Sequence, residues 1–201
     1  MTHLIIYAHP NKQSFNHAIL QQTVQAGNKL GVETVVRDLY NLNFNPVLSW
    51  EEVKAAGQGI IPSEIQFEQQ LITQAKLITL IYPLWWMGFP AILKGYLDRV
   101  LTHGFAYKTD ETGTVGLIHN KRMQQFITIG NNEQEYQTLG FDKSLNDCLI
   151  NGLFNYCGIM DVRHQFFGDI HLIDEQARLA ILEQVEQITE QITEQNLVDN
   201  E

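Results

Sequence analysis

The sequence predicts an α/β fold in which a doubly wound, five-stranded parallel sheet carries helices on both faces. Short, almost continuous apolar runs alternate along the chain with segments of helical spacing. Such alternation is typical of a parallel sheet whose strands are buried on both faces. The length of 201 residues suits a single domain, residues 1–201, with one sizeable core.

The first half of the chain supplies three predicted strands, at residues 4–8, 32–36 and 77–81. Helices are predicted over residues 14–30 and 63–75 between them, and a third helix is opened by Pro90. In that third helix one buried face is marked by apolar side chains at i, i+4, i+7 and i+8, which are Leu93, Leu97, Val100 and Leu101.

The second half adds strands at residues 124–129 and 161–166, with a continuous helix over 141–156 between them. An amphipathic helix through Ile181, Val185, Ile188 and Ile192 closes the chain. Residues 39–61 and 102–121 lack clean periodicity and are predicted to be long functional or partner-binding loops. Five strands in this arrangement fit the flavodoxin-like architecture.

Composition excludes several classes of function. Lys and Arg number 13 against 23 Asp and Glu, a net charge of −10, so nucleic acid and anionic membrane surfaces are poor partners. No apolar run reaches the roughly 18 residues of a membrane span, and cytoplasmic localisation is therefore expected. Cys148 and Cys157 lie nine residues apart on one predicted helix and are expected to be buried free thiols.

An aromatic turn at residues 81–90 joins the third strand to the next helix. In an open parallel sheet, ligands collect beyond the carboxyl ends of the strands. Trp85, Trp86 and Met87, beside the unobstructed backbone of Gly88, would form an apolar and polarisable wall that suits a large planar ring. The alternative is that one of the tryptophans packs in the core or against another subunit.

The first strand is followed by His9, and Ser14 is suited to cap the next helix. His9, Ser14, Asn16 and the backbone between them could cradle a phosphate at the helix N-terminus. The alternative is that Ser14 only caps the helix and that His9 makes its hydrogen bonds within the turn. G-x-G-x-x-G and G-x-x-x-x-G-K-[ST] are both absent. A phosphate after strand one and a ring after strand three suit flavin mononucleotide (FMN).

A third polar segment, residues 128–136, follows the fourth strand. Thr128, Gly130 and Asn131 could present backbone N–H groups to the polar edge of a flavin, and Tyr136 could donate to charge on the reduced ring. A plain polar loop is the alternative. The seven histidines show no spacing of a metal site, so no metal is predicted, and no G-x-S-x-G nucleophile motif occurs.

Four segments of the chain resemble, in the same order, the NAD(P)H:quinone reductase family. They are His9 with 14–16, then 42–48, 83–95 and 104–107. That family includes DT-diaphorase, the bacterial modulator-of-drug-activity proteins and the ancillary oxidoreductases of glutathione-gated potassium efflux. The resemblance runs from about Leu4 to Tyr136 and implies the same flavodoxin-like fold.

From these segments and the resemblance together, the residues expected to bind the cofactor are His9, Ser14, Phe15, Asn16, Pro83, Leu84, Trp85, Trp86, Met87, Thr128, Gly130 and Asn131. Tyr136 is the expected catalytic residue. The resemblance also implies a homodimer in which Phe105 and Tyr107 line the substrate pocket across the subunit boundary. DT-diaphorase has a histidine six residues after its tyrosine, where Asp142 stands here, so its proton relay does not carry over.

The expected activity is therefore that of an NAD(P)H:quinone oxidoreductase, with FMN, or alternatively FAD, as cofactor and NAD(P)H as co-substrate. Nicotinamide and quinone would react in turn at one place, by a ping-pong mechanism with hydride transfer. Two alternatives remain open. One is a flavodoxin-type electron carrier, and the other is a flavin-binding regulatory subunit of a potassium-efflux system with a peripheral membrane partner.

Overall fold

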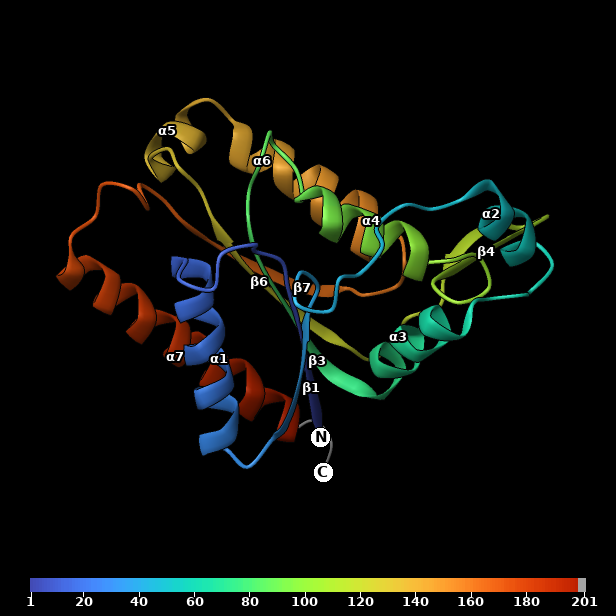
Figure 1. Ribbon diagram of the computed structural model, residues 1–201, viewed down its shortest axis with the longest axis horizontal. Helices are drawn as coiled ribbons and strands as arrows, with labels where there is room; N and C mark the ends of the chain where they lie inside the picture. Colours follow the sequence, from blue (N-terminus) through green and yellow to red (C-terminus); the bar gives the residue numbers. More distant parts are fainter. Residues whose placement is uncertain (199–201) are drawn as a thin grey trace.

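A computed structural model describes residues 1–198, and its central sheet has the strand order β2-β1-β3-β6-β7 (Figure 1). The elements in chain order are β1 (Thr2–Tyr7), α1 (Phe15–Lys29), β2 (Glu33–Asp38), α2 (Trp50–Ala56), α3 (Ser63–Gln74), β3 (Ala75–Pro83), α4 (Ala91–Val100), β4 (Tyr107–Asp110), β5 (Gly113–Gly116), β6 (Arg122–Thr128), α5 (Glu133–Thr138), α6 (Phe141–Leu145), the π-helix η1 (Asn146–Asn155), β7 (Asp161–Phe167) and α7 (Glu175–Val198). The predicted flavodoxin-like α/β fold is confirmed.

All neighbours in this sheet pair in parallel, and the register brings three strand ends together. Tyr7 at the end of β1 lies opposite Ile81 of β3, and Pro83 at the end of β3 lies opposite Thr128 at the end of β6. The loops that leave β1, β3 and β6 therefore start at one edge of the sheet, because parallel strands end on the same side.

Helices cover both faces of the sheet and bury two cores (Figure 1). α1 and α7 lie together on one face, over a cluster that includes Tyr7 and Phe126. α3, α4 and the segment from α6 to η1 lie on the other face, over a larger cluster that includes Tyr82 and Tyr96. Burial on both faces explains why the strands are almost continuously apolar in sequence.

The two segments predicted to be loops contain regular structure. Within 39–61, α2 is held by a capping box in which Ser49 Oγ accepts from the Glu52 N–H and the Glu52 carboxylate accepts from the Ser49 N–H. No residue of α2 is buried, so it shows no apolar periodicity. Within 102–121, β4 and β5 form an antiparallel hairpin.

Three further expectations need correction. The helix predicted over 141–156 begins as α6 but continues as a π-helix rather than as an α-helix. Cys157 is a buried free thiol as expected, whereas Cys148 is free but exposed. Pro90 is the N-cap residue of α4 and lies just before its first turn.

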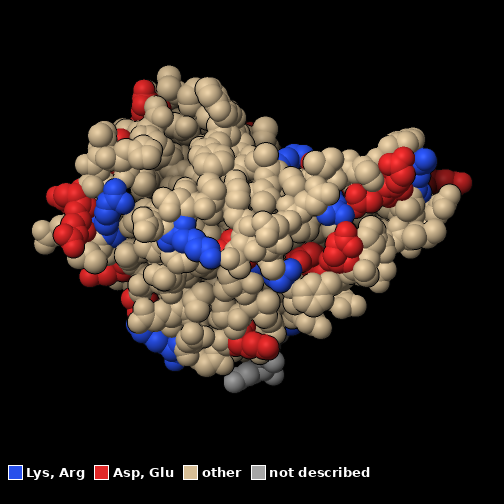
Figure 2. Space-filling view, in the orientation of Figure 1, with Lys and Arg blue, Asp and Glu red and all other residues tan. Residues whose placement is uncertain are grey.

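Charged side chains of both signs are scattered over the face of the molecule shown in Figure 2, and acidic groups gather toward its lateral ends. No continuous basic stripe crosses this face. None of the helices within residues 1–198 combines the length and the apolarity that crossing a bilayer requires.

Buried His3 on β1 should make stability depend on pH. Its Nε2 lies 2.8 Å from Thr79 Oγ1, and burial lowers its pKa from 6.5 to about 4. As pH falls from 6.5 toward 4, the unfolded chain binds a proton that folded His3 does not. The free energy of unfolding should therefore fall by about 3 kcal/mol across this window through His3.

Urea unfolding of the parent, His3→Gln and His119→Gln between pH 8 and pH 4 measures this effect. His119 is exposed and serves as the control. We expect the pH slope to be reduced in His3→Gln and kept in His119→Gln. An equal slope in all three proteins would contradict the assignment.

Candidate functional site

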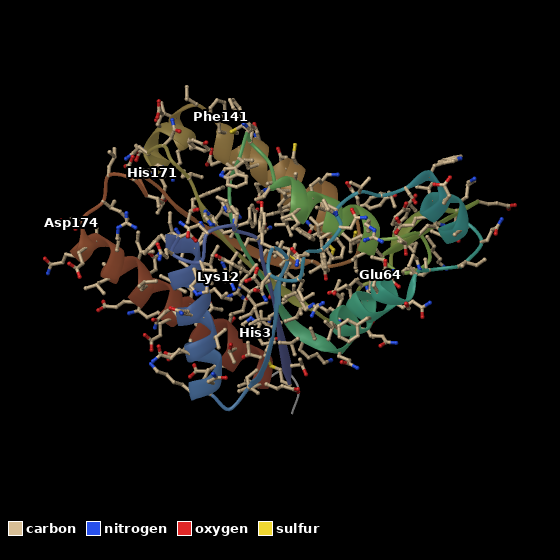
Figure 3. The ribbon with its side chains drawn as sticks, viewed as in Figure 1. His3, Lys12, Glu64, Phe141, His171 and Asp174 are labelled. Carbon is tan, nitrogen blue, oxygen red and sulfur yellow. The ribbon has the colours of Figure 1, made fainter. Side chains whose placement is uncertain are left out.

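A cleft of about 480 Å³ opens at the carboxyl ends of β1, β3 and β6. Nine of the predicted site residues line it, which are His9, Ser14, Phe15, Asn16, Pro83, Leu84, Trp85, Thr128 and Gly130. Five lining residues were not predicted, which are Asn11, Ile129, Ile170, His171 and Arg178. Figure 3 shows His171 on the loop that leads from β7 to α7, far from His3 near the start of β1.

The loop after β1 reaches across the cleft to β6. Ser14 caps α1, because its Oγ accepts from the His17 N–H at 3.2 Å. Asn16 Nδ2 donates to Thr128 Oγ1 at 2.7 Å, a contact between residues 112 positions apart. Asn16 is only 3% exposed, and its Oδ1 has no partner among the described residues. A buried acceptor without a hydrogen bond is energetically unfavourable. A ligand in the cleft that donates a hydrogen bond to this oxygen would remove that cost.

His9 lines the cleft and is held there by the backbone of Asn11. Its Nδ1 lies 3.0 Å from the Asn11 backbone nitrogen and 3.2 Å from the Asn11 carbonyl oxygen, and these contacts hold the ring against the loop. Burial lowers the pKa of His9, and the backbone of Asn11 raises it by a smaller amount. The neutral form of the ring is therefore favoured at neutral pH. Its centroid lies 6.2 Å from a ring centroid of Trp85.

Arg178 supplies a positive charge to the same cleft. Its guanidinium carbon lies 5.2 Å from the ring centroid of Phe15, and its Nη2 donates to the Ile170 carbonyl at 2.6 Å. Arg178 stands near the start of α7, where the helix dipole disfavours a cation. A cation at the start of a helix is the sequence feature that could have identified Arg178 as a residue that binds an anion.

The aromatic turn after β3 is a two-residue hairpin turn. Trp85 and Gly88 exchange two backbone hydrogen bonds of 3.1 Å, and Trp86 and Met87 between them have φ of 51° and 58°. Positive φ at both central positions is typical of a type I′ turn and is usually supplied by Asn or Gly. A bulky residue there costs roughly 1–2 kcal/mol, and such strain concentrates at functional sites.

Trp85, rather than Trp86 or Met87, forms the aromatic wall of the cleft within this chain. Trp86 is fully exposed and Met87 is 40% exposed, and neither lines the cleft. Trp86 therefore projects from the strained turn without cover from its own chain, whereas Met87 is partly covered.

Two further predicted residues, Asn131 and Tyr136, do not line the cleft. Asn131 follows Gly130, and its carbonyl accepts from the Asp169 N–H at 3.0 Å. Tyr136 is half-buried on α5 and packs edge-on against Phe141, with ring centroids 5.6 Å apart. Figure 3 shows Phe141 at the start of α6.

Phe105 packs against the larger core cluster, and Tyr107 belongs to a separate aromatic group. Tyr107 contacts His103 and Tyr156, with ring centroids 5.6 Å and 5.3 Å away. None of these residues lines the cleft of its own chain. Within residues 1–198 no group of His, Cys, Asp and Glu is placed to hold a metal ion.

α4 fixes the position of the aromatic turn, because it begins directly after it. A Cβ on Gly95 would lie 2.1 Å from the Pro46 carbonyl oxygen, so only glycine allows the loop over 39–49 to approach the helix. Arg99 Nη1 donates to the Asn45 carbonyl at 2.9 Å, and its Nη2 lies 2.7 Å from Glu52. Two separate segments of the sequence resemblance, 42–48 and 83–95, therefore meet in space.

The fold and the cleft define a flavodoxin-like protein with a ligand site at the carboxyl edge of its sheet. The profile of a family described as having a flavodoxin-like fold matches residues 1–192. The chain is 62% identical over 191 residues to a Haemophilus influenzae protein named as an uncharacterized NAD(P)H oxidoreductase, covering 94% of this chain and 95% of that protein.

It is also 32% identical to NAD(P)H dehydrogenase [quinone] 1 of Rattus norvegicus, over 90% of this chain and 73% of that protein. Among solved structures, the NAD(P)H:quinone oxidoreductase from Methanothermobacter marburgensis superposes with a TM-score of 0.87 at 27% identity, covering 96% and 98% of the two chains. The chain belongs to the flavodoxin-like family that contains the NAD(P)H:quinone reductases, as the four sequence segments predicted.

The loop after β1 should control ligand retention. Ser14→Ala with Asn16→Ala removes the helix cap and the buried amide, and each lost hydrogen bond to a charged group costs about 1.5–3 kcal/mol. We expect much weaker FMN binding in a protein that still folds. Fluorescence titration of the apoprotein with FMN, with circular dichroism to verify folding, measures the change.

Gln13→Ala is the matched control, because Gln13 lies on the same loop, is exposed and does not line the cleft. It should bind FMN as the parent does. Unchanged affinity in the double variant would locate the phosphate elsewhere.

Proposed function

We propose that the protein is an FMN-dependent NAD(P)H:quinone oxidoreductase that transfers two electrons as a hydride. Family membership makes it an NAD(P)H oxidoreductase of the flavodoxin-like class. The observation that carries the flavin proposal is the cleft itself, which joins a helix N-terminus with polar and basic groups to an indole wall. A phosphate and a large planar ring are the two chemical features that match these two ends.

The residues at the phosphate end fit an anion in three ways. Ser14 opens α1, whose first N–H groups attract negative charge. The imidazole of His9 lines the same cleft, and Arg178 adds a permanent charge. Buried Asn16 Oδ1 is an acceptor without a partner among the described residues, which suits a hydroxyl of the sugar chain. FAD remains the alternative cofactor, with the same phosphate group at this end.

Bound flavin would supply a ring that accepts and donates hydride, and the chain would supply orientation and electrostatics. Trp85, Pro83 and Leu84 would hold the ring by apolar contact, and the Gly130 backbone would be available to its polar groups. One open side would then serve nicotinamide and quinone in turn, which is ping-pong behaviour. Tyr136 would donate a hydrogen bond as negative charge develops on the ring or the acceptor.

Asp142 takes the place of the histidine that accompanies the tyrosine in DT-diaphorase. It is half-buried next to Phe141, on which Tyr136 packs, and its charge raises the pKa of His164 while burial lowers that pKa more strongly. We assign proton delivery to Tyr136 and solvent.

We further propose a homodimer with shared pockets. Tyr107, His103 and Tyr156 form an aromatic group that does not line the cleft of its own chain. Trp86 at the strained turn is fully exposed. A second copy that brings its Tyr107 group to this turn would cover Trp86 and close the substrate side of the pocket.

Steady-state kinetics tests the catalytic proposal. Varying NADH against a quinone should give parallel double-reciprocal lines and two-electron reduction of the quinone. Tyr136→Phe should slow single-turnover hydride transfer by roughly ten- to a thousandfold, the range expected for loss of one transition-state donor, with unchanged flavin content.

Leu139→Ala, an exposed change on the same segment, is the control and should react at the parent rate. Intersecting lines that require a ternary complex refute the ping-pong proposal. A Tyr136→Phe variant as fast as the parent refutes the role of Tyr136.

Mixed dimers test the shared pocket. A Tyr107→Ala chain co-expressed with a Ser14→Ala, Asn16→Ala chain should give heterodimers with one intact and one doubly damaged pocket. Roughly half of the parental activity should return in the heterodimer, since one of two pockets is whole. The same changes combined in one chain give no such recovery when purified alone. A fully active monomer in sedimentation at micromolar concentration would disprove sharing.

A further inference from the structure

A second cleft, of about 600 Å³, opens at the amino ends of β3, β6 and β7. It is lined by Lys76, Lys121, Arg122, Asp161 and Asn196, among others. The carboxyl end of β3, where the flavin cleft lies, is about 25 Å away along the strand. The two clefts therefore occupy opposite edges of the same sheet.

The parallel register explains why these charges meet. Leu77 pairs with Arg122, and Arg122 pairs with Asp161. Lys76 and Lys121 each precede one of these paired residues, so they lie side by side at the start of neighbouring strands. Chain segments separated by more than 40 positions in sequence thus deliver their cations to one place.

Among the described residues that line this cleft, positive charge exceeds negative charge. Asp161 is the one carboxylate among the described lining residues, and it is shared between Arg122 Nε at 2.9 Å and Arg163 Nε at 3.2 Å. Lys121 Nζ donates to the uncharged carbonyls of Thr73 and Ala75.

The two lysines also affect each other. Burial lowers the pKa of Lys121, and the positive charge of Lys76 lowers it further. Neighbouring like charges at the edge of a protein interior repel each other unless an anion lies between them. These cations lie together although the chain has a net charge of −10.

We propose that this cleft is a binding site for a small phosphorylated molecule, held chiefly by Lys76 and Lys121. Ammonium groups act as point charges that pair well with phosphate oxygens. The cleft volume is in the range of sites that hold small metabolites. The proposal is independent of flavin chemistry, because no residue of the flavin cleft takes part in it.

Calorimetric titration with inorganic pyrophosphate, in the presence of saturating FMN and at low ionic strength, tests the site. The parent should bind one pyrophosphate per chain, and affinity should fall as sodium chloride is added. Lys76→Gln should weaken binding about tenfold or more, since it removes a charge-assisted contact. Lys121→Arg keeps the charge and should retain binding within a few-fold, which guards against a folding defect from loss of Lys121.

Two matched variants locate the binding event. Lys143→Gln removes an exposed lysine outside this cleft and should leave affinity unchanged. Ser14→Ala with Asn16→Ala damages the opposite cleft and should also leave pyrophosphate affinity unchanged, whatever it does to FMN. The proposal is overturned if pyrophosphate does not bind, if Lys76→Gln binds it as the parent does, or if binding is lost only in the Ser14, Asn16 variant.

Discussion

The parallel pairing of β3 with β1 on one side and β6 on the other is the constraint on which the candidate site depends. It brings the loops after all three strands to one edge of the sheet. The hydrogen bond from Asn16 to Thr128 then joins the first loop to the third strand end. A shift of β3 by one residue would reverse which faces its side chains occupy and would separate these loops. Sheet register and site geometry are therefore set by the same contacts.

The aromatic turn is strained, and the surrounding structure holds it in place. Trp86 and Met87 have left-handed backbone conformations that bulky residues rarely adopt. The turn is closed by the two Trp85–Gly88 hydrogen bonds and is followed by α4, which the close approach of Pro46 to Gly95 fixes against the loop over 39–49. Packing of distant segments thus offsets a local cost, which is the pattern expected where side chains are presented for binding.

Sequence reasoning located every strand of the large sheet, because strands buried on both faces appear as apolar runs bounded by polar residues. It missed α2, whose stability comes from the Ser49–Glu52 capping box and not from a buried face. It also missed the hairpin of β4 and β5, whose strands are mostly exposed. The π-helical course of 146–155 was not predictable from the spacing of its apolar residues. Arg178 was missed because its charge reaches the cleft only through the tertiary position of α7.

The direction of the helices gives the two edges of the sheet different electrostatic character. Helices α1, α4 and α7 begin at the carboxyl edge, where their N-termini already favour negative charge, so Arg178 is misplaced there unless an anion binds. Helix α3 ends at the amino edge, where terminal carbonyls favour cations, and Lys121 satisfies them directly. Helix termini therefore explain the position of Lys121 but not the positions of Lys76 and Arg178. Each of these two cations lines a cleft, and an anionic ligand is the partner that would account for it.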